Sequence, residues 1–219
     1  MDRVTEAFVW PYRDSEWVVK LLIIALISLI PIAGQINNLG WMLATLDRLR
    51  GGEERLAPAN LSYLGRGVRV YVVVLIYLLV LLAIGFAIYL PGLALAVQQG
   101  HGQGNAGLIA LAIVLNLISF GVFTLGSLAL TFMLPAIILT TDTGGIGAGL
   151  RIGDVLRRAR VNPINTLIAG LMLIAASFVG SLGLIACGIG ILFTNAYAVA
   201  MQAWIVRSFE IGSAAHTAA

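Results

Sequence analysis

Four long apolar tracts constrain the fold of this chain more than any other feature. They cover about residues 18–46, 70–97, 107–141 and 164–206. Each tract exceeds the roughly 20 residues that a helix needs to cross the hydrocarbon core of a bilayer. The tracts are continuously apolar, whereas the strands of a membrane β-barrel alternate apolar and polar residues. The sequence therefore predicts an all-α fold, a polytopic membrane helix bundle.

The composition agrees with this class. Apolar residues make up 60 % of the chain and charged residues only 11 %, whereas about a quarter of the residues in a soluble domain are charged. The amino-terminal segment mixes acidic and basic residues and has no small-residue cleavage site. We therefore expect the first apolar tract to remain in the mature protein.

The first and last tracts are each expected to hold two helices. Residues 164–206 are too long for one crossing, and glycines concentrate at 179–190. In the first tract, "LIPIAGQINNLGW" at 29–41 fits either one kinked span or a hairpin of two short helices, and the hairpin fits the lengths better. We predict about six membrane helices in one transmembrane domain, including a short N-terminal and a C-terminal helical hairpin. The approximate spans are 16–32, 36–49, 70–97, 107–141, 163–182 and 185–207.

Arginines mark the expected orientation of the bundle. They concentrate in the loops 47–69 and 142–163, whereas 98–106 has no formal charge. By the positive-inside rule both arginine loops face the cytoplasm, which predicts a multi-pass plasma-membrane protein with both termini cytoplasmic. Within the second loop, apolar and basic residues at spacings of three and four predict a short amphipathic helix that ends before Asn162. The arginines expected to contact lipid headgroups are Arg48, Arg50, Arg151, Arg157 and Arg158.

The chain offers little for catalysis. The spans carry acidic, basic or histidine side chains only near their ends, and the chain has no metal-ligand spacing and no recognised catalytic motif. The single cysteine, Cys187, is expected to be a packing residue, and His101 lies in the neutral loop. The arginines are not interleaved with exposed aromatic residues, as nucleic-acid binding would favour. We expect no enzyme, no cofactor, no metal and no nucleic-acid partner.

Amide side chains are the notable polar groups of the spans. An amide needs a partner in hydrocarbon, so each is expected to bind across a helix interface or to line a polar cavity for a small molecule or lipid headgroup. In the first tract we expect Pro31 and Gly34 to let the chain turn, and the amides that follow to bind the backbone groups that this turn frees. The candidate polar intramembrane cluster comprises Gln35, Asn37, Asn38, Asn116 and Asn195.

The amino-terminal third carries a recognisable order of motifs. Tyr12-Arg13-Asp14-Ser15-Glu16-Trp17 precedes the first tract, and Pro31, Gly40-Trp41, Arg50-Gly51, Leu56-Ala57-Pro58 and Gly67 follow. In this order the chain resembles the DUF4013 family of prokaryotic membrane proteins, most closely over residues 8–80. Ala57 is a departure, because leucine is expected directly before the proline. The function of that family is unknown, so the resemblance implies a membrane fold and carries over no site residue.

Two functions fit these observations. The absence of catalytic groups, the short loops and the many small residues favour an accessory, scaffold or assembly component that associates with other membrane proteins or lipids. Membrane lipids, other integral membrane proteins and a homo-oligomer are the expected partners. The alternative is a transporter or channel for a small neutral or lipidic solute, which would use the amide residues.

Overall fold

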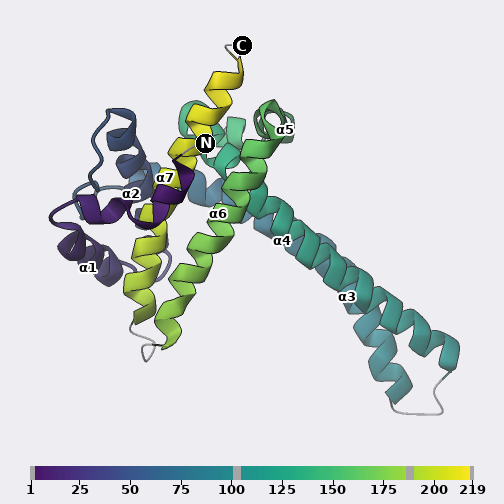
Figure 1. The fold of residues 1–219 in the computed structure, drawn as a ribbon. Coiled ribbons are helices and arrows are strands. Elements are labelled where there is room, and N and C mark those ends of the chain that lie inside the picture. The colour runs from purple at the N-terminus through teal and green to yellow at the C-terminus, as the bar shows by residue number, and fades with distance from the viewer. Residues whose placement is uncertain (1–2, 101–104, 186–189, 218–219) are drawn as a thin grey trace. The chain divides into compact units, whose positions relative to one another are not determined.

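The computed structural model describes residues 3–100, 105–185 and 190–217, and over these ranges its regular secondary structure is entirely helical (Figure 1). The all-α class is confirmed for this part of the chain. Cys187 and His101 lie outside the described residues. The α-helices are α1 (Trp17–Ile27), α2 (Ala33–Arg50), α3 (Leu64–Gly100), α4 (Ala106–Gly149), α5 (Ile152–Val161), α6 (Pro163–Ser181) and α7 (Gly190–Thr217). Three short 3-10 helices are η1 (Val4–Phe8), η2 (Trp10–Arg13) and η3 (Leu182–Ile185).

Three helical segments of the described chain are long and apolar enough to cross a membrane. They are Leu64–Gln99, Ala106–Gly149 and Pro163–Ile185. Helix α1 is apolar as well, but its 11 residues reach only about 16 Å at the usual rise per residue. The long apolar helices indicate a membrane protein, while the number of six membrane helices stays a prediction.

The first apolar tract breaks between α1 and α2. Ile32 has φ 62°, and the Ala33 N–H donates to the Pro31 carbonyl at 2.6 Å, which makes a tight and strained three-residue turn. A single helix through this region is therefore excluded. Gly34 permits the close return of the chain, because a Cβ there would lie 2.4 Å from the Ile27 carbonyl oxygen. The prediction that the following amides bind backbone groups freed by the turn is wrong for Asn37 and Asn38. Asn37 donates to the Asn60 carbonyl and Asn38 donates to the Ser28 hydroxyl instead.

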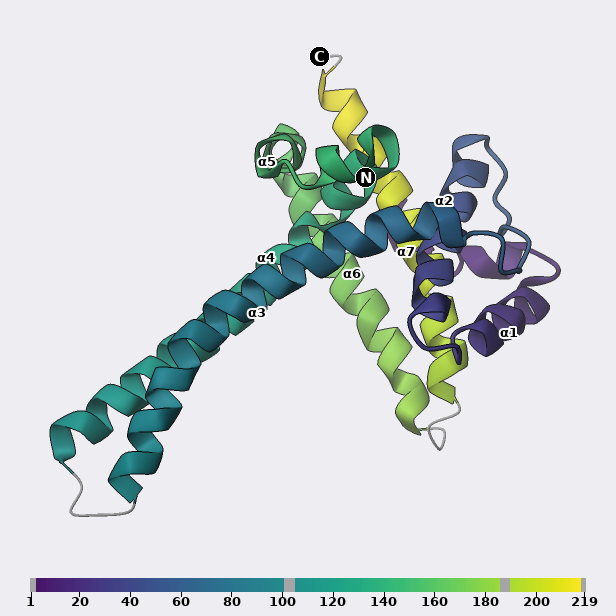
Figure 2. The same cartoon turned by 180° about the vertical axis from the view of Figure 1, so that it is seen from behind.

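The chain divides into two compact units. One comprises Met1–Val73 with Thr131–Ala219, and the other comprises Val74–Leu130. The second unit is an antiparallel pair formed by the carboxyl-terminal part of α3 and the amino-terminal part of α4, which run side by side in Figures 1 and 2. Ser119 donates to the Gly85 carbonyl at 3.0 Å, and the rings of Phe86 and Phe123 lie 5.6 Å apart. Small residues thus let these two helices approach closely.

Helix α7 is the centre of the first unit. Every residue from Ala196 to Val206 is buried except Gln202, because α7 packs against α1, α2, α6 and the amino-terminal 3-10 helices. Figure 1 shows α6 beside α7 along its length. Helix α6 ends at Ser181 and α7 begins at Gly190, within the segment where the sequence predicts a break. Helix α7 is therefore buried on nearly all sides over 196–206, and Gln202 is the residue of this stretch that is not buried.

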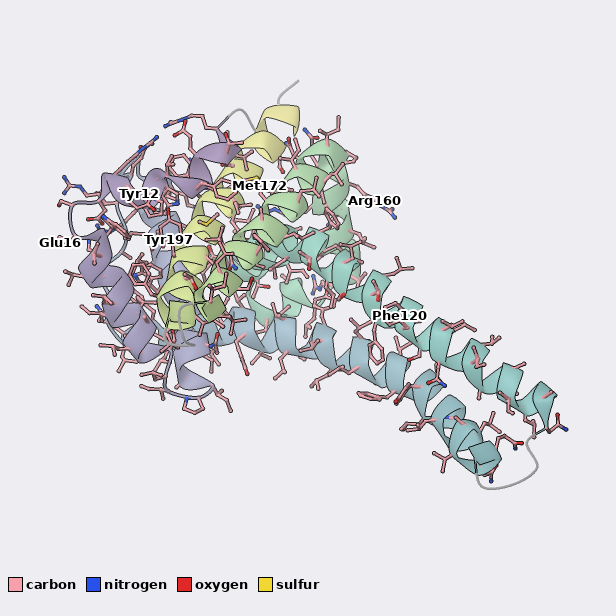
Figure 3. The ribbon with its side chains drawn as sticks, turned by 60° about the horizontal axis from the view of Figure 1, so that its bottom comes forward. Tyr12, Glu16, Phe120, Arg160, Met172 and Tyr197 are labelled. Carbon is pink, nitrogen blue, oxygen red and sulfur yellow. The ribbon has the colours of Figure 1, made fainter. Side chains whose placement is uncertain are left out.

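The second arginine-rich segment folds as predicted. Helix α5 buries Val155 and Ala159, while Arg160 on its other side is exposed (Figure 3), so the expected amphipathic helix is confirmed. It ends before Asn162, whose side chain accepts a hydrogen bond from the Asn165 N–H and caps α6. Pro163 follows at the first position of α6, where its missing N–H is tolerated.

Candidate functional site

A buried carboxylate anchors the amino-terminal part of the first unit. Asp14 is 2 % exposed and accepts hydrogen bonds from the N–H groups of Glu16 and Leu56, each at 2.9 Å, and from Lys20 Nζ at 2.7 Å. Burial raises the pKa of Asp14, but the bonds from Lys20 and the two amides outweigh it and hold that pKa below its ordinary value. Asp14 therefore ties the start of α1 to the segment between α2 and α3.

Helix α2 holds the same segment from its other side. Trp41 Nε1 donates to the Ala57 carbonyl at 3.0 Å, and the Ala57 N–H donates to Thr45 Oγ1 at 3.2 Å. Gly67 of α3 lies so close to α2 that a Cβ there would sit 1.8 Å from the Ile36 carbonyl oxygen. We call Asp14, Trp41, Thr45, Leu56, Ala57 and Gly67 the amino-terminal clamp.

The amino-terminal 3-10 helices η1 and η2 pack against α7. Trp10 stacks on Trp204 at 5.5 Å, and the guanidinium groups of Arg3 and Arg13 lie 5.5 and 5.6 Å from the Trp204 ring centre. Tyr12 and Tyr197 lie near one another, with ring centres 5.7 Å apart (Figure 3). These contacts cover one side of α7 and explain the burial of Tyr197 and Trp204.

The two arginines that cover Trp204 also bridge two carboxylates. Arg3 and Arg13 each bind both Glu6 and Glu54. The hydrogen bond from Arg3 lowers the pKa of Glu6 to about 2, and the bond from Arg13 adds to the effect. These exposed pairs join η1 and η2 to the segment that follows α2.

A second set of ion pairs joins four helices of the first unit. Arg50 binds Asp142 at 3.0 Å and Glu210 at 2.9 Å, and Arg66 binds Asp142 at 2.7 Å. Burial raises the pKa of Glu210, but bonds from Arg50 and Arg207 lower it below its ordinary value. This network was not predicted from the sequence. The available signal was that Asp142 and Glu210 lie just beyond the predicted spans 107–141 and 185–207, in a chain with few charges.

The arginines predicted to meet lipid headgroups differ in their contacts. Arg48 binds the Leu56 carbonyl and Glu53, Arg50 belongs to the network above, and Arg157 pairs with Asp154. Arg151 is exposed and Arg158 is half-buried, and neither has an ion pair with a described residue. Headgroup contact stays a prediction for these arginines. No group of three or more metal-ligating side chains occurs within residues 3–100, 105–185 and 190–217.

The most distinctive polar feature lies in a groove between α6 and α7. The groove has a volume of about 410 Å³, with Ser177, Gly180 and Ser181 on the α6 side and Asn195 and Gln202 on the α7 side. Gly180 lets the helices meet, because a Cβ there would already lie 3.2 Å from the Ala198 Cβ. Asn195 and Gln202 are seven residues apart, or about two helical turns, and so they share one face of α7.

The two amides of this groove differ from the hydroxyl groups around them. Ser177 donates to the Leu173 carbonyl at 2.9 Å, and Ser181 donates to the Phe178 carbonyl at 2.7 Å. Asn195 and Gln202 are half-exposed, and their side chains form no hydrogen bond with any residue that the structure describes. In hydrocarbon such a group costs about 2 kcal/mol or more unless it finds a partner. If the groove lies within a bilayer, its two amides therefore need a polar partner.

The amides predicted as one cluster occupy separate environments. Asn37 Nδ2 donates to the Asn60 carbonyl at 2.9 Å, and Asn38 Nδ2 donates to Ser28 Oγ at 2.8 Å. Asn116, in the second unit, donates to the Ala112 carbonyl of its own helix at 2.8 Å, and Gln35 is exposed. Of the predicted set, Asn195 alone lines the groove. Gln202, which the set left out, lines it as well.

The fold defines a class of protein, a helical membrane protein. The groove gives it a partly polar surface between α6 and α7. The family described as "Protein of unknown function (DUF4013)" matches residues 23–189, and the chain belongs to it. No curated protein and no solved structure matches the chain. Trp41 and Leu56-Ala57 of the clamp lie within the matched range, whereas Asp14 lies before it. Trp41 binds the Ala57 carbonyl, and Asp14 binds the Leu56 N–H. These motif residues therefore hold the fold together.

Proposed function

We propose that this chain is a non-enzymatic, multi-pass protein of the plasma membrane that acts by lateral association. In this role it is an accessory, scaffold or assembly component for other membrane proteins or lipids. One observation carries the proposal: Asn195 and Gln202 line a groove between the candidate span Pro163–Ile185 and α7, and they have no hydrogen-bond partner among the described residues. A neighbouring molecule would supply the hydrogen bonds that these two side chains lack.

Energetics support a partner at this place. A hydrogen bond between membrane helices contributes about 0.5–2 kcal/mol, and the groove offers two such sites on one face of α7. Ala176 and Gly180 on α6 are small and buried, and Gly180 faces Ala198 of α7. The α6–α7 pair is thus tightly packed internally, which gives a partner a defined surface to bind.

The arginines suggest the orientation of the protein and a second contact. The amphipathic helix α5 exposes Arg157 and Arg160 together with Ile152, which is 56 % exposed, and its N-cap residue Arg151 is exposed as well. A helix of this kind lies at the surface of a leaflet and attracts anionic headgroups. We propose that α5 rests on the cytoplasmic leaflet, that both termini are cytoplasmic, and that lipids are partners on this side.

Photo-crosslinking in native membranes tests the proposed association. A photoreactive residue is placed at Asn195 or at Gln202, and the matched control is Leu26 of α1, which is apolar and 64 % exposed. Lateral association predicts a discrete adduct, either one protein or one lipid class, at both α7 positions and not at Leu26. The same heterogeneous lipid adducts at all three positions would contradict the proposal.

A transport function is the second candidate, and a specific observation favours testing it. The side-chain oxygens of Asn37 and Asn38 are buried and accept no hydrogen bond from the described residues. Amide oxygens inside a membrane protein can bind a polar solute. Flux of glycerol or of a fluorescent phospholipid in proteoliposomes, lost in Asn37→Ala and Asn38→Ala, would replace the association proposal with transport.

A further inference from the structure

We infer that the partner in the α6–α7 groove is a second copy of this chain, arranged as a parallel pair about an axis along the membrane normal. The inference rests on the proposed lateral association and names its partner. It is carried by the chemistry of Asn195 and Gln202, by their depth in α7, and by an exposed aromatic side chain beside the groove.

The chemistry of the groove is complementary to itself. A carboxamide has two N–H donors and one acceptor oxygen, so it can pair with an identical carboxamide. In a parallel twofold pair, equivalent residues of the two chains meet at the same depth. Asn195 would then face Asn195 of the second copy, and Gln202 would face Gln202. Each amide side chain of the groove would then have an identical side chain of the second copy as its hydrogen-bond partner.

Under the predicted span 185–207, the position of Gln202 favours a protein partner over a lipid headgroup. Gln202 lies 12 residues after Gly190, the first residue of α7, which corresponds to about 18 Å along the helix. If α7 starts at the outer surface of a hydrocarbon core of about 30 Å, Gln202 lies near its middle. Acyl chains offer no hydrogen-bonding group at that depth, so the inference assigns Gln202 a polar side chain or backbone group of another helix as its partner.

A side chain suited to fill the groove lies next to it. Phe178 is 66 % exposed and follows Ser177, which lines the groove, so it lies about 100° further round α6. Leu171 and Ile174 continue the same exposed apolar stripe, at 53 % and 41 % exposure. The groove volume of about 410 Å³ can accept an aromatic side chain. In a twofold pair, Phe178 of each chain can enter the groove of the other at the same level.

Thiol crosslinking of the full chain in its native membrane tests this inference. Leu192, which also lines the groove, is replaced by cysteine in a Cys187→Ser background, and a short bismaleimide is added. This position leaves both amides intact. Leu26→Cys, on α1, is the matched control. We expect a covalent dimer for Leu192→Cys and only monomer for Leu26→Cys.

The amides are then removed from the crosslinking variant. Gln202→Leu, and separately Asn195→Leu, should weaken the dimer about 3- to 30-fold, as expected for the loss of hydrogen bonds between membrane helices. Phe178→Ala should also lower the dimer yield. A dimer whose yield is unchanged by all three substitutions would overturn the inference.

The outcomes separate this inference from the proposed function. A Leu192→Cys adduct with a different protein overturns the second copy as partner and leaves lateral association standing. Only monomer, together with no discrete photo-adduct at Asn195 or Gln202, contradicts both. A photo-adduct from Asn195 or Gln202 to another segment of the same chain would also overturn the inference.

Discussion

The amino-terminal clamp and the α6–α7 groove handle their polar side chains in opposite ways. In the clamp, Asp14 accepts three hydrogen bonds and Trp41 donates to a buried carbonyl. In the groove, Asn195 and Gln202 have no partner in the described part of the chain. The polar groups of the clamp bind one another within the chain, whereas those of the groove are available to the partner proposed above.

The same amino acid illustrates both uses. Asn38 is 2 % exposed and donates to Ser28, whereas Asn195 is half-exposed and donates to no described residue. Substitutions in the clamp should therefore lower the free energy of unfolding, and substitutions in the groove should change association alone. The predictions below test that distinction, from the largest expected effect to the smallest.

Removal of the clamp carboxylate should be the most damaging change. Asp14→Ala leaves Lys20 without its buried partner and the Leu56 N–H without an acceptor, so we expect a loss of about 3–5 kcal/mol in the free energy of unfolding. Thermal unfolding in detergent micelles measures it. Glu16→Gln is the control, because Glu16 lies 3.4 Å from Lys20 and is 72 % exposed. Equal effects of the two variants would contradict the clamp.

The same carboxylate gives the clamp a pH dependence. The pKa of Asp14 is lower in the folded chain than its ordinary value, so its stabilising effect is complete above about pH 4. The effect is lost as the pH falls through the folded pKa. Between about pH 6 and about pH 3, the stability of the wild type should fall more than that of Asp14→Asn. Parallel pH curves for both proteins would refute this assignment.

Close packing of α3 against α2 should come next in magnitude. Gly67→Ala places a Cβ 1.8 Å from the Ile36 carbonyl oxygen, and overpacking of this kind costs about 1–3 kcal/mol or more. Gly65→Ala, in the same turn of α3, meets no atom within 4 Å and should be neutral or stabilising by up to about 1 kcal/mol. Thermal unfolding of the pair isolates the steric effect, and similar melting temperatures would argue against the close approach.

A buried amide of α2 should have a moderate effect. Asn38→Ala removes the hydrogen bond to Ser28 and should destabilise the protein by about 1–3 kcal/mol. Gln35→Ala, in the same turn but exposed, should change the stability by no more than about 0.5 kcal/mol. Chemical denaturation in detergent compares the two. If Gln35→Ala lowered the stability more than Asn38→Ala, the assignment of Asn38 as the structural amide would be wrong.

Much of the fold could be predicted from the sequence, because membrane helices leave a strong local pattern. The helical class, the break at 179–190 and the amphipathic helix before Asn162 follow from apolar length, glycine content and charge spacing. The turn before α2 was harder to place. Its γ-type geometry depends on Ile32, a residue with no intrinsic preference for positive φ, so the sequence did not show that α2 begins at Ala33, three residues before the predicted start at 36.

The candidate site could be predicted only in part. Amide side chains look alike in a sequence, and their partners come from distant segments, as with Asn37 and Asn60. Asn195 was included for its residue type, but Gln202 was left out of the set although it lies seven residues away on the same helical face. The ion pairs of Asp142 with Arg50 and Arg66 likewise depend on the packing of helices far apart in the chain.

The central claim is that the groove amides serve association and contribute little to the stability of the single chain. Single-molecule photobleaching in liposomes, at equal protein-to-lipid ratio, counts chains per particle for the wild type and for N195L/Q202L. The account predicts mainly two-step particles for the wild type and mainly one-step particles for the double variant, with melting temperatures in detergent that agree. An unchanged step distribution, or a double variant that loses stability as Asn38→Ala does, would contradict it.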